Sequence, residues 1–307
     1  MSNDIAFLFP GQGSQYAGMG QALYEAHPEI HGVFHQADEI LGIPLTQICF
    51  QGPTDVLTDT INAQPAILTV STAALEAMKV TGVYEPPSFV AGHSMGEFSA
   101  LVGAGSLSFE AALHLVRERG RLMKLAGERN PGGMAAVIGL DVEVLAGVCA
   151  DAHRESGAVI QIANDNCPGQ TVISGDKEAL AIAMQKAEAA GARRVVPLAV
   201  SIAAHTPLME VVADEFAAAV DAAPIGDATV PLVANVSARP ISSAQEIRAE
   251  LKAQLVSPVQ WTDSMRYLLD QGVAHVVEIG PKDVLIGLMR RIERQVERSS
   301  FGDVAIA

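Results

Sequence analysis

The segment from Ser88 to Val102 constrains the fold of this chain more than any other. It reads SFVAGHSMGEFSALV, where an apolar stretch leads into Gly92-His93-Ser94-Met95-Gly96 and a helix-forming stretch follows. A serine spaced this way between two glycines, after a strand and before a helix, is typical of a nucleophile elbow, a tight turn that exposes the hydroxyl. The alternative is a glycine-rich turn with a passive serine. Even an elbow serine can pass an acyl group either to water or to another acceptor.

The rest of the chain has the alternation of strand and helix that such an elbow requires. An apolar strand, residues 5–9, runs into the loop Pro10-Gly11-Gln12-Gly13-Ser14-Gln15, and further strands are expected near residues 232–235 and 275–279, each followed by a helix. Residues 66–78 should form a buried helix that opens at Gln64-Pro65, with proline near its start. Because 49% of the residues are hydrophobic but only 5% aromatic, we expect an α/β fold with helices covering a parallel sheet.

Residues 132–199 have a different pattern. They predict strands and helices in the order β-α-β-β-α-β, which is the ferredoxin-like arrangement. Pro197, in the last of these strands, favours an edge position because proline cannot donate to a sheet. We therefore expect a discontinuous α/β domain, residues 1–131 and 200–307, with an inserted α+β subdomain at 132–199.

Charge and hydropathy exclude several classes of protein. The formal net charge of −15 argues against a nucleic-acid partner. The longest uncharged stretches, such as residues 195–209, are too short to span a membrane, and the N-terminal residues lack the pattern of a secretory signal. The three cysteines, an odd number without metal-ligand spacing, favour reduced thiols and a cytoplasmic protein.

An elbow serine needs a base, and eight histidines are available. His27, His31 and His35 are spaced by four residues, which could place them on one helix face for a metal, although an exposed polar face is the simpler interpretation. His93 adjoins Ser94 and should point elsewhere. His205 differs, because it lies in the uncharged stretch VSIAAHTPLM. Such a histidine is either a satisfied core residue or a catalytic base, and this pattern does not decide between them.

Arg119 occupies an unexpected place on its helix. At about 100° per residue, the helix over residues 109–126 has an apolar stripe, and Arg119 lies within that stripe. Arg117, Arg121 and Lys124 lie on the opposite, solvated side. Burying an unpaired guanidinium costs several kcal/mol, so Arg119 must have a partner. That partner is either Glu97, in an internal salt bridge, or a substrate carboxylate held by two parallel hydrogen bonds.

These residues together resemble the malonyl-CoA:acyl carrier protein transacylase family. The resemblance covers nearly the whole chain, and its motifs occur in the order found in that family. They are Phe9-Pro10-Gly11-Gln12-Gly13-Ser14-Gln15, Gly92-His93-Ser94-Met95-Gly96-Glu97, Arg119, Asn164-Asp165-Asn166-Cys167-Pro168-Gly169-Gln170, His205, Pro258-Val259-Gln260-Trp261 and Glu278-Ile279-Gly280-Pro281.

The resemblance implies a hydrolase-like α/β domain with a ferredoxin-like insertion, and a role for each matching residue. Ser94 would be the nucleophile and His205 its base, oriented by the main-chain carbonyl of Gln254 rather than by an acid. Arg119 would hold the malonyl carboxylate. The backbone N–H groups of Gln12 and Met95 would form the oxyanion hole. Residues expected at the acyl pocket and the coenzyme A arm are Gln64, Asn164, Asn166 and Ala204.

The implied reaction moves malonyl from coenzyme A to the phosphopantetheine thiol of acyl carrier protein, through a malonyl-serine ester, in fatty acid synthesis and without a metal or redox cofactor. Ala204 departs from the aromatic residue or serine that many relatives carry before the histidine, so we expect a pocket that is not strictly selective for malonyl and has room for methylmalonyl. The carrier is acidic, so it would need a local basic surface. Arg193-Arg194 and Arg290-Arg291 are the densest basic pairs, and either pair could simply be solvated.

Three alternatives remain open from the sequence. A transferase of the same fold could serve a polyketide or malonate decarboxylase pathway. A serine thioesterase or esterase would use the same elbow, but the chain lacks an evident triad acid and places Arg119 inward. An interaction module without catalysis would have no need for Ser94, His205, Arg119 and Gln12 together.

Overall fold

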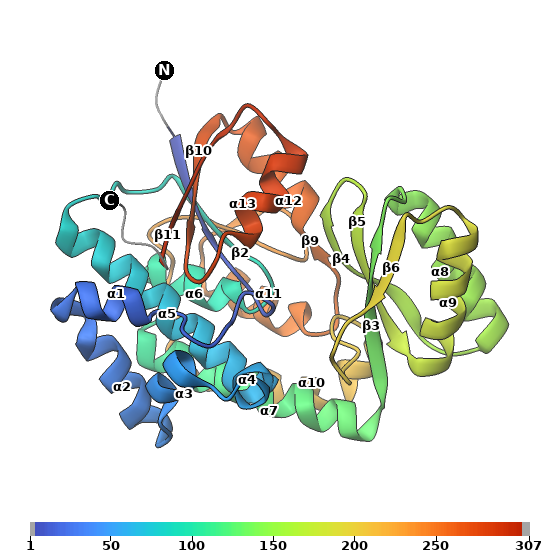
Figure 1. Ribbon diagram of the computed structural model, residues 1–307, viewed down its shortest axis with the longest axis horizontal. Coiled ribbons are helices and arrows are strands. Elements are labelled where there is room, and N and C mark those ends of the chain that lie inside the picture. The colour runs from blue at the N-terminus through green and yellow to red at the C-terminus, as the bar shows by residue number, and fades with distance from the viewer. Residues whose placement is uncertain (1–3, 303–307) are drawn as a thin grey trace.

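The computed structural model of the protein describes residues 4–302 and consists of a larger and a smaller lobe (Figure 1). The larger lobe has a sheet in the order β11-β10-β1-β2-β7-β8, in which β8 is antiparallel to β7 and every other described neighbour pair is parallel. This confirms the α/β expectation. The strands are β1 (Asp4–Phe9), β2 (Phe89–Gly92), β7 (Leu232–Val233), β8 (Pro240–Ile241), β10 (Val273–Ile279) and β11 (Glu297–Phe301).

Helices cover both faces of this sheet, as the alternation along β1 requires. Phe7 and Phe9 pack into one hydrophobic core with helices α5 to α7, whereas Ala6 and Leu8 pack into another with α12 and α13. The helices of this lobe are α1 (Gln21–Ala26), η1 (Pro28–Ile30), α2 (His31–Leu41), α3 (Leu45–Gln51), α4 (Thr54–Thr58), α5 (Thr60–Thr81), α6 (Gly96–Gly103), α7 (Phe109–Arg129), η2 (Pro207–Val212), α10 (Ala213–Ala222), α11 (Ala244–Gln254), α12 (Trp261–Asp270) and α13 (Val284–Ile292).

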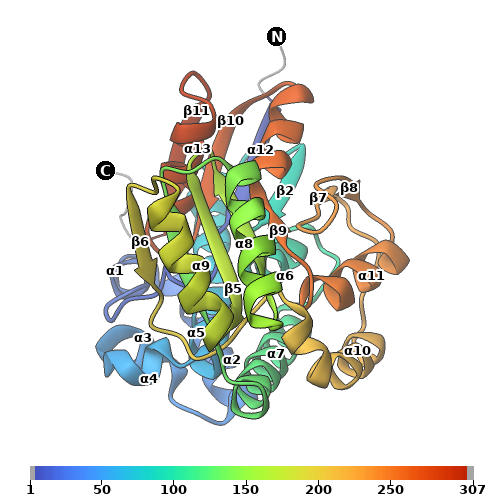
Figure 2. The ribbon, with the colours of Figure 1, turned by 90° about the vertical axis from the view of Figure 1, so that its right-hand side faces the viewer.

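The smaller lobe is a second sheet in the order β6-β3-β5-β4-β9, with α8 and α9 packed on the outward face that Figure 2 shows. β6 is an edge strand, as Pro197 indicates. β9 pairs parallel to β4 and comes from the C-terminal part of the chain, outside residues 132–199. The elements are β3 (Gly132–Ile138), α8 (Val142–Ser156), β4 (Ile160–Cys167), β5 (Gln170–Asp176), α9 (Lys177–Ala189), β6 (Arg194–Pro197) and β9 (Val259–Gln260).

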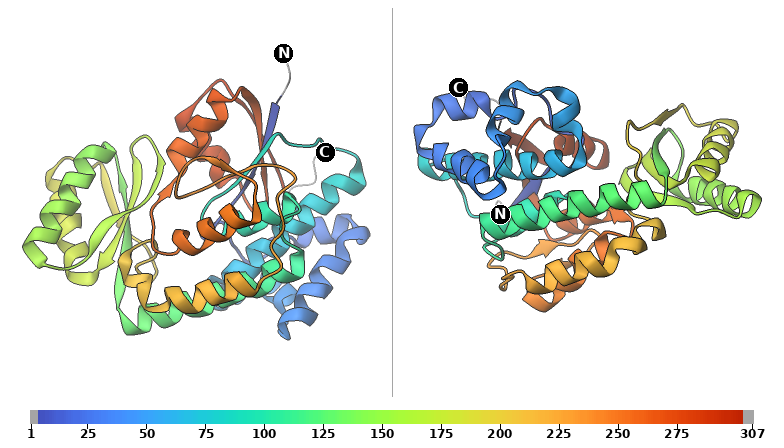
Figure 3. Two further views of the ribbon diagram at one scale, coloured as in Figure 1. Left: turned by 180° about the vertical axis from the view of Figure 1, so that it is seen from behind. Right: turned by 90° about the horizontal axis from the view of Figure 1, so that it is seen from below.

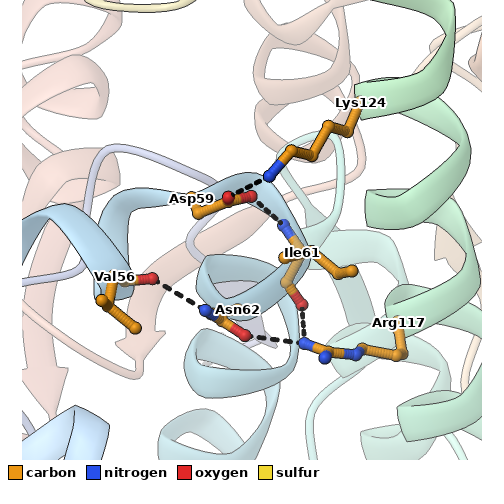
Figure 4. Close-up of polar contacts among 6 residues, drawn as sticks. All are labelled: Val56, Asp59, Ile61, Asn62, Arg117 and Lys124. Atoms are coloured by element: carbon orange, nitrogen blue, oxygen red, sulfur yellow. Dashed lines mark hydrogen bonds and ion pairs between the residues drawn. The ribbon is translucent and has the colours of Figure 1, made fainter.

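Helix α5 begins earlier than the sequence indicates, so the expected start at Gln64-Pro65 is wrong. The helix starts at Thr60, its N-cap Asp59 accepts a hydrogen bond from the Ile61 N–H, and Pro65 lies inside it. Proline cannot donate to the carbonyl four residues earlier, which is that of Ile61. Arg117 Nη1 donates to this carbonyl at 2.7 Å instead, and also to Asn62 Oδ1 (Figure 4). A side chain from α7 thus compensates for the proline.

Helix α7 runs beneath the larger lobe toward the smaller one, and β3 follows it (Figure 3, right). Arg119 lies on its buried stripe, 2% exposed, while Arg121 and Lys124 are exposed and form ion pairs with Glu215 and Asp59. Arg117 does not share their solvated face, because its contacts with α5 leave it only partly exposed. None of the described helices is long and apolar enough to cross a membrane.

Candidate active site

Ser94 lies at the carboxyl edge of the large sheet, immediately after β2. Its φ of 52° is in the left-handed region, which is costly for a residue with a side chain and is typical of functional sites. The flanking glycines are required by space. A Cβ on Gly92 would lie 2.0 Å from the carbonyl carbon of Gly96, and a Cβ on Gly96 would lie 2.2 Å from the Phe9 carbonyl oxygen. The turn therefore has the geometry of an elbow.

The Ser94 hydroxyl lies 2.8 Å from Nε2 of His205, which is 3% exposed and also has a positive φ. On the other side of the ring, Nδ1 lies 2.9 Å from the Gln254 carbonyl oxygen and 3.1 Å from that of Ser257. Because both partners are acceptors, Nδ1 must carry the proton, which leaves Nε2 free to accept one from Ser94. Gln254 thus occupies the place expected for it, and shares that contact with Ser257.

Burial and the positive charge of Arg119 lower the pKa of His205 to about 3, although the hydrogen bonds to Gln254 and Ser257 oppose this. The imidazole is therefore neutral at any pH well above 3, as a proton acceptor must be.

This pKa predicts an unusual pH profile. A base with the ordinary pKa near 6.5 would lose about 30-fold of its active form between pH 8 and pH 5. Since the His205 pKa lies below this window, the second-order rate constant for acylation of Ser94 by an ester or thioester should stay nearly constant across it. That constant reports the free enzyme, and quenched-flow assays with circular dichroism as the folding control would measure it. A fall of about tenfold or more toward pH 5 in folded protein would contradict the assignment.

Arg119 connects the serine to a second polar cluster. Its Nη1 donates to Gln64 Oε1 at 3.0 Å, and its Nη2 donates to Ser94 Oγ at 3.1 Å and to Gln254 Oε1 at 3.0 Å. Its Nε has no hydrogen-bond partner within the described residues. Burial lowers its pKa to about 10, so the guanidinium remains charged at neutral pH. A buried cation held only by neutral acceptors is suited to an anionic ligand.

The expected salt bridge between Arg119 and Glu97 is not formed, which corrects one of the two sequence interpretations. The Glu97 carboxyl instead accepts from the backbone N–H of Asn235 at 2.7 Å and from Gln254 Nε2 at 2.5 Å. Burial and the nearby Glu250 raise the pKa of Glu97. The hydrogen bonds from Asn235 and Gln254 and the charge of Arg119 oppose this rise, so Glu97 acts on Arg119 through its charge and not through a direct contact.

The serine, histidine and arginine open into one cavity of about 340 Å³ between the two lobes. Gln12 and Met95, the expected oxyanion-hole residues, lie on its wall beside Ser94. The full lining is Gln12, Gly13, Gln15, Thr58, His93, Ser94, Met95, Arg119, Met123, Met134, Asn164, Asn166, Val172, Leu198, Ala199, Val200, Ile202, Ala204 and His205.

The remaining expected residues lie at or beside this cavity. Asn164, Asn166 and Ala204 line it, whereas Gln64 lies behind Arg119 and contacts the site through that residue. His93 points away from the serine, as expected, and its Nε2 lies 2.7 Å from Asn166 Oδ1. This contact occupies the Asn166 oxygen that a ligand could otherwise use.

Sequence reasoning missed several residues that organise the site. The Gln254 side chain joins Arg119, Glu97 and the Ser94 carbonyl, a role beyond that of its main chain. Asn235 contacts the elbow on both sides of His93. One signal was available for Asn235, since a polar residue directly after a buried strand of a parallel sheet lies at the ligand-binding edge.

The spacing of His27, His31 and His35 has a structural explanation. His27 lies between α1 and η1 rather than on the helix of the other two, and His31 stacks on Tyr24. Residues 4–302 contain no group of three or more His, Cys, Asp or Glu side chains placed to hold a metal ion.

Comparison with known proteins places this chain among related sequences and structures. Residues 6–304 match the acyl transferase domain family. The chain is similar to a malonyl CoA-acyl carrier protein transacylase of Bacillus subtilis, 45% identical over 97% of this chain and 93% of that protein. It is also similar to one of Staphylococcus aureus, 41% identical over 96% and 94% of the two chains.

Solved structures agree with the sequences. An acyl carrier protein S-malonyltransferase from Vibrio cholerae superposes with a TM-score of 0.94 at 40% identity, covering 98% of this chain and 97% of that one. A malonyl-transacylase in complex with its type II PKS acyl-carrier protein superposes with the same TM-score and identity, covering 98% and 96%.

Proposed function

The chain belongs to the malonyl CoA-acyl carrier protein transacylase family of acyl transferases, and from that membership and the site geometry we propose its function. The protein transfers a malonyl group from coenzyme A to the phosphopantetheine thiol of acyl carrier protein. We further propose that Ser94 is the nucleophile, His205 the base and Arg119 the carboxylate-binding residue.

The main observation in support of this proposal is the hydrogen bond between the Arg119 guanidinium and the Ser94 hydroxyl. The carboxylate carbon and the thioester carbon of a malonyl group are separated by one methylene, about 2.5 Å apart. Arg119 Nη2 lies 3.1 Å from Ser94 Oγ, so one short diacid can meet the hydroxyl and the guanidinium together. A longer acid would have its carboxylate beyond the arginine, and an acetyl group would leave the arginine without its partner.

In the first half of the reaction, Ser94 Oγ attacks the thioester carbonyl carbon and its proton passes to His205 Nε2. The oxyanion that forms is placed against the backbone N–H groups of Gln12 and Met95, and Met95 precedes helix α6, whose N-terminal dipole favours negative charge. Collapse breaks the carbon–sulfur bond, and the imidazolium returns its proton to the leaving coenzyme A thiolate. A malonyl ester on Ser94 remains.

In the second half, the carrier thiol gives its proton to His205 Nε2 and its sulfur attacks the ester carbonyl. Collapse expels Ser94 Oγ, which regains its proton from the imidazolium, and malonyl leaves on the carrier. Each step balances with the groups of the chain and its two substrates, so we propose that no metal or redox cofactor takes part. While malonyl is bound, its carboxylate offsets the Arg119 charge that lowers the His205 pKa, which strengthens the base.

A direct test offers the enzyme malonyl-CoA with three acceptors: phosphopantetheinylated carrier, unmodified carrier and water alone. We expect malonyl-carrier only with the first, measured by mass spectrometry of the carrier. Release of free malonate at a comparable rate without the modified carrier would instead indicate a thioesterase.

We place the reaction in cytoplasmic fatty acid synthesis, a setting that fits the three buried free cysteines. A similar enzyme is found in complex with a type II PKS acyl-carrier protein, so a polyketide carrier is the second candidate. Comparing kcat/KM for a fatty acid carrier and a polyketide carrier would separate them. The same comparison of malonyl-CoA with methylmalonyl-CoA would test whether the small Ala204, at the cavity wall, admits the larger group.

The acidic carrier would meet the basic surface formed by Arg290, Arg291, Arg294 and Arg298. These arginines line a groove of about 600 Å³ and form no ion pair with any residue in the range 4–302. Arg291 donates to the Pro168 and Gly169 carbonyls, in the turn just after the cavity residue Asn166. The other expected pair, Arg193-Arg194, is one residue removed from this turn, since Arg193 lies beside Gly139 and the Gly139 N–H donates to the Gly169 carbonyl.

Reversing one of these charges should weaken the reaction with carrier without affecting the reaction with malonyl-CoA. Arg290→Glu should raise the KM for carrier by about tenfold at low salt, with the effect shrinking as salt increases, while acylation by malonyl-CoA is unchanged. Arg266→Glu, exposed on α12, is a matched control. If acylation by malonyl-CoA fell as much as carrier turnover, the groove would bind coenzyme A rather than the carrier.

A further inference from the structure

Asn235 lies where the ladder between two strands of the large sheet stops. β2 pairs with β7 through Val90 and Ala91, opposite Leu232 and Val233. After Val233 the β7 backbone turns away, and the Ala234 N–H donates to the Arg239 carbonyl. The expected strand over residues 232–235 is thus shorter than its sequence suggests. Asn235, which is fully buried, leaves the strand with its side chain directed at the elbow.

Beyond Val233, the Asn235 side-chain amide makes the hydrogen bonds to the β2 side that a longer β7 backbone would make. Its Nδ2 donates to the Gly92 carbonyl at 2.7 Å, and its Oδ1 accepts from the Ser94 N–H at 2.7 Å. These two groups flank His93, and the N–H and C=O of one residue in a parallel neighbour strand would bond the same pair. On the opposite side, the His93 N–H donates to the Phe9 carbonyl of β1. The turn is therefore held from both sides.

Such support is needed because the elbow is strained. Ser94 has a left-handed backbone without being glycine, and conformations of this kind are costly and persist only where the surroundings fix them. Release of that strain would rotate the peptide that carries the hydroxyl. Ser94 Oγ would then leave His205 Nε2 and Arg119 Nη2 together.

Asn235 also connects the elbow to the carboxylate site. Its backbone N–H donates to Glu97 Oε1, and Glu97 Oε2 accepts from Gln254 Nε2. The Gln254 side chain then accepts from Arg119 and donates to the Ser94 carbonyl. One buried chain of hydrogen bonds thus fixes the serine relative to the arginine.

We propose that Asn235 is a positioning residue for the nucleophile: its side-chain amide, by bonding the Gly92 carbonyl and the Ser94 N–H at once, holds the elbow in the conformation that aims Ser94 at His205. The inference rests on the proposed function, since it assumes that Ser94 reacts. It adds to that function a residue that touches neither substrate and acts only through the backbone of the turn.

The variant Asn235→Asp tests this because it removes one bond reversibly. An ionised carboxylate can accept from the Ser94 N–H but repels the Gly92 carbonyl, whereas a protonated carboxyl can donate to that carbonyl as the amide does. The titratable groups around residue 235 are Glu97 on α6, which accepts from its backbone N–H, and Glu250 on α11, which accepts from the next N–H. His93 lies between the two elbow groups that the side chain bonds, and Arg119 on α7 reaches the same elbow at Ser94 Oγ. Burial and the two glutamates raise its pKa, so mild acid should protonate it.

The measured quantity is the rate at which a fluorophosphonate probe labels Ser94, which needs the serine and histidine but no malonyl or carrier. At pH 8 we expect Asn235→Asp to label about 100-fold more slowly than wild type, and to recover at least tenfold of this by pH 5. Wild type should change little over the same range. A rise in rate with added acid is the reverse of what loss of a base would give. It is also a response that simple destabilisation would not produce.

Thr229→Val is the matched control, because it deletes one hydrogen bond, to the Ala104 carbonyl, away from the site. It should lower the melting temperature yet label at the wild-type rate. If Asn235→Asp does not fold, Asn235→Ser replaces it, since a hydroxyl is too short to reach both groups. That variant should label about 100-fold more slowly at every pH.

Labelling of folded Asn235→Asp at the wild-type rate, or slow labelling that acid does not restore, would overturn the proposal. Wild-type labelling by the folded serine variant would do the same. Failure of the wild-type enzyme to label at Ser94 would instead overturn the proposed function, so the two failures are distinguishable.

Discussion

Replacing Ser94 with alanine is expected to reduce malonyl transfer to carrier on the order of 10⁴-fold or more. The hydroxyl is the only group placed 2.8 Å from His205 Nε2 among the described residues, and without it no covalent intermediate can form. Transfer assays and intact-protein mass spectrometry would measure the loss. Because the Ser94 side chain accepts only one further hydrogen bond, from Arg119, the variant should fold and bind malonyl-CoA.

His205→Ala should cause a loss of similar size, and combining the two substitutions should add little, because the two side chains act as one unit. Ser99→Ala, on the helix after the elbow, controls for the loss of a buried hydroxyl. Transfer by Ser94→Ala within about tenfold of wild type would show that another residue carries the acyl group.

Replacing Arg119 with alanine is expected to change which substrate the enzyme prefers. The kcat/KM for malonyl-CoA should fall roughly 30- to 900-fold, a loss of about 2–4 kcal/mol in transition-state stabilisation, which is the range for a buried charge-assisted contact. Acetyl transfer should be spared or improved, because acetyl has no carboxylate to lose and the His205 pKa is no longer lowered by the arginine charge. Competition between malonyl-CoA and acetyl-CoA measures the ratio directly.

Two further variants test whether the effect depends on the guanidinium group and on its position at residue 119. Arg119→Lys keeps the charge but not the planar fork, so its malonyl activity should lie between wild type and Arg119→Ala. Arg121→Ala, two residues along the same helix and exposed, should leave both activities unchanged. If Arg119→Ala weakened both substrates equally, the arginine would serve the structure of the site rather than substrate choice.

What the sequence could predict depended on local patterns. The elbow was predictable because the spacing of Gly92, Ser94 and Gly96 and the flanking strand and helix all lie within fifteen residues. Arg119 was predictable as inward-facing because the period of α7 places it among apolar residues. His205 was already a candidate base from its uncharged stretch, and the family resemblance decided its role and added Gln254, both far in sequence from Ser94.

What could not be predicted depended on contacts distant in sequence. α5 begins before Pro65 because Arg117, on another helix, bonds the Ile61 carbonyl. Glu97 fails to pair with Arg119 because Asn235 and Gln254, more than 130 residues away, take its two oxygens. The only local signal for Asn235 is its place after a buried strand, which does not identify its partner Ser94, 141 positions away. Side-chain hydrogen bonds of this range follow from the folded arrangement alone.

The central claim is that Ser94 and Arg119 together hold a malonyl group on its way from coenzyme A to a carrier thiol. The most direct measurement is intact-protein mass spectrometry, with peptide mapping, of the enzyme mixed with malonyl-CoA and separately with acetyl-CoA. One malonyl group should be found on Ser94, in clear excess over acetyl, persisting in water and discharged at once by phosphopantetheinylated carrier. An acyl group on another residue, equal loading of acetyl, or loss to water as fast as to carrier would contradict the account.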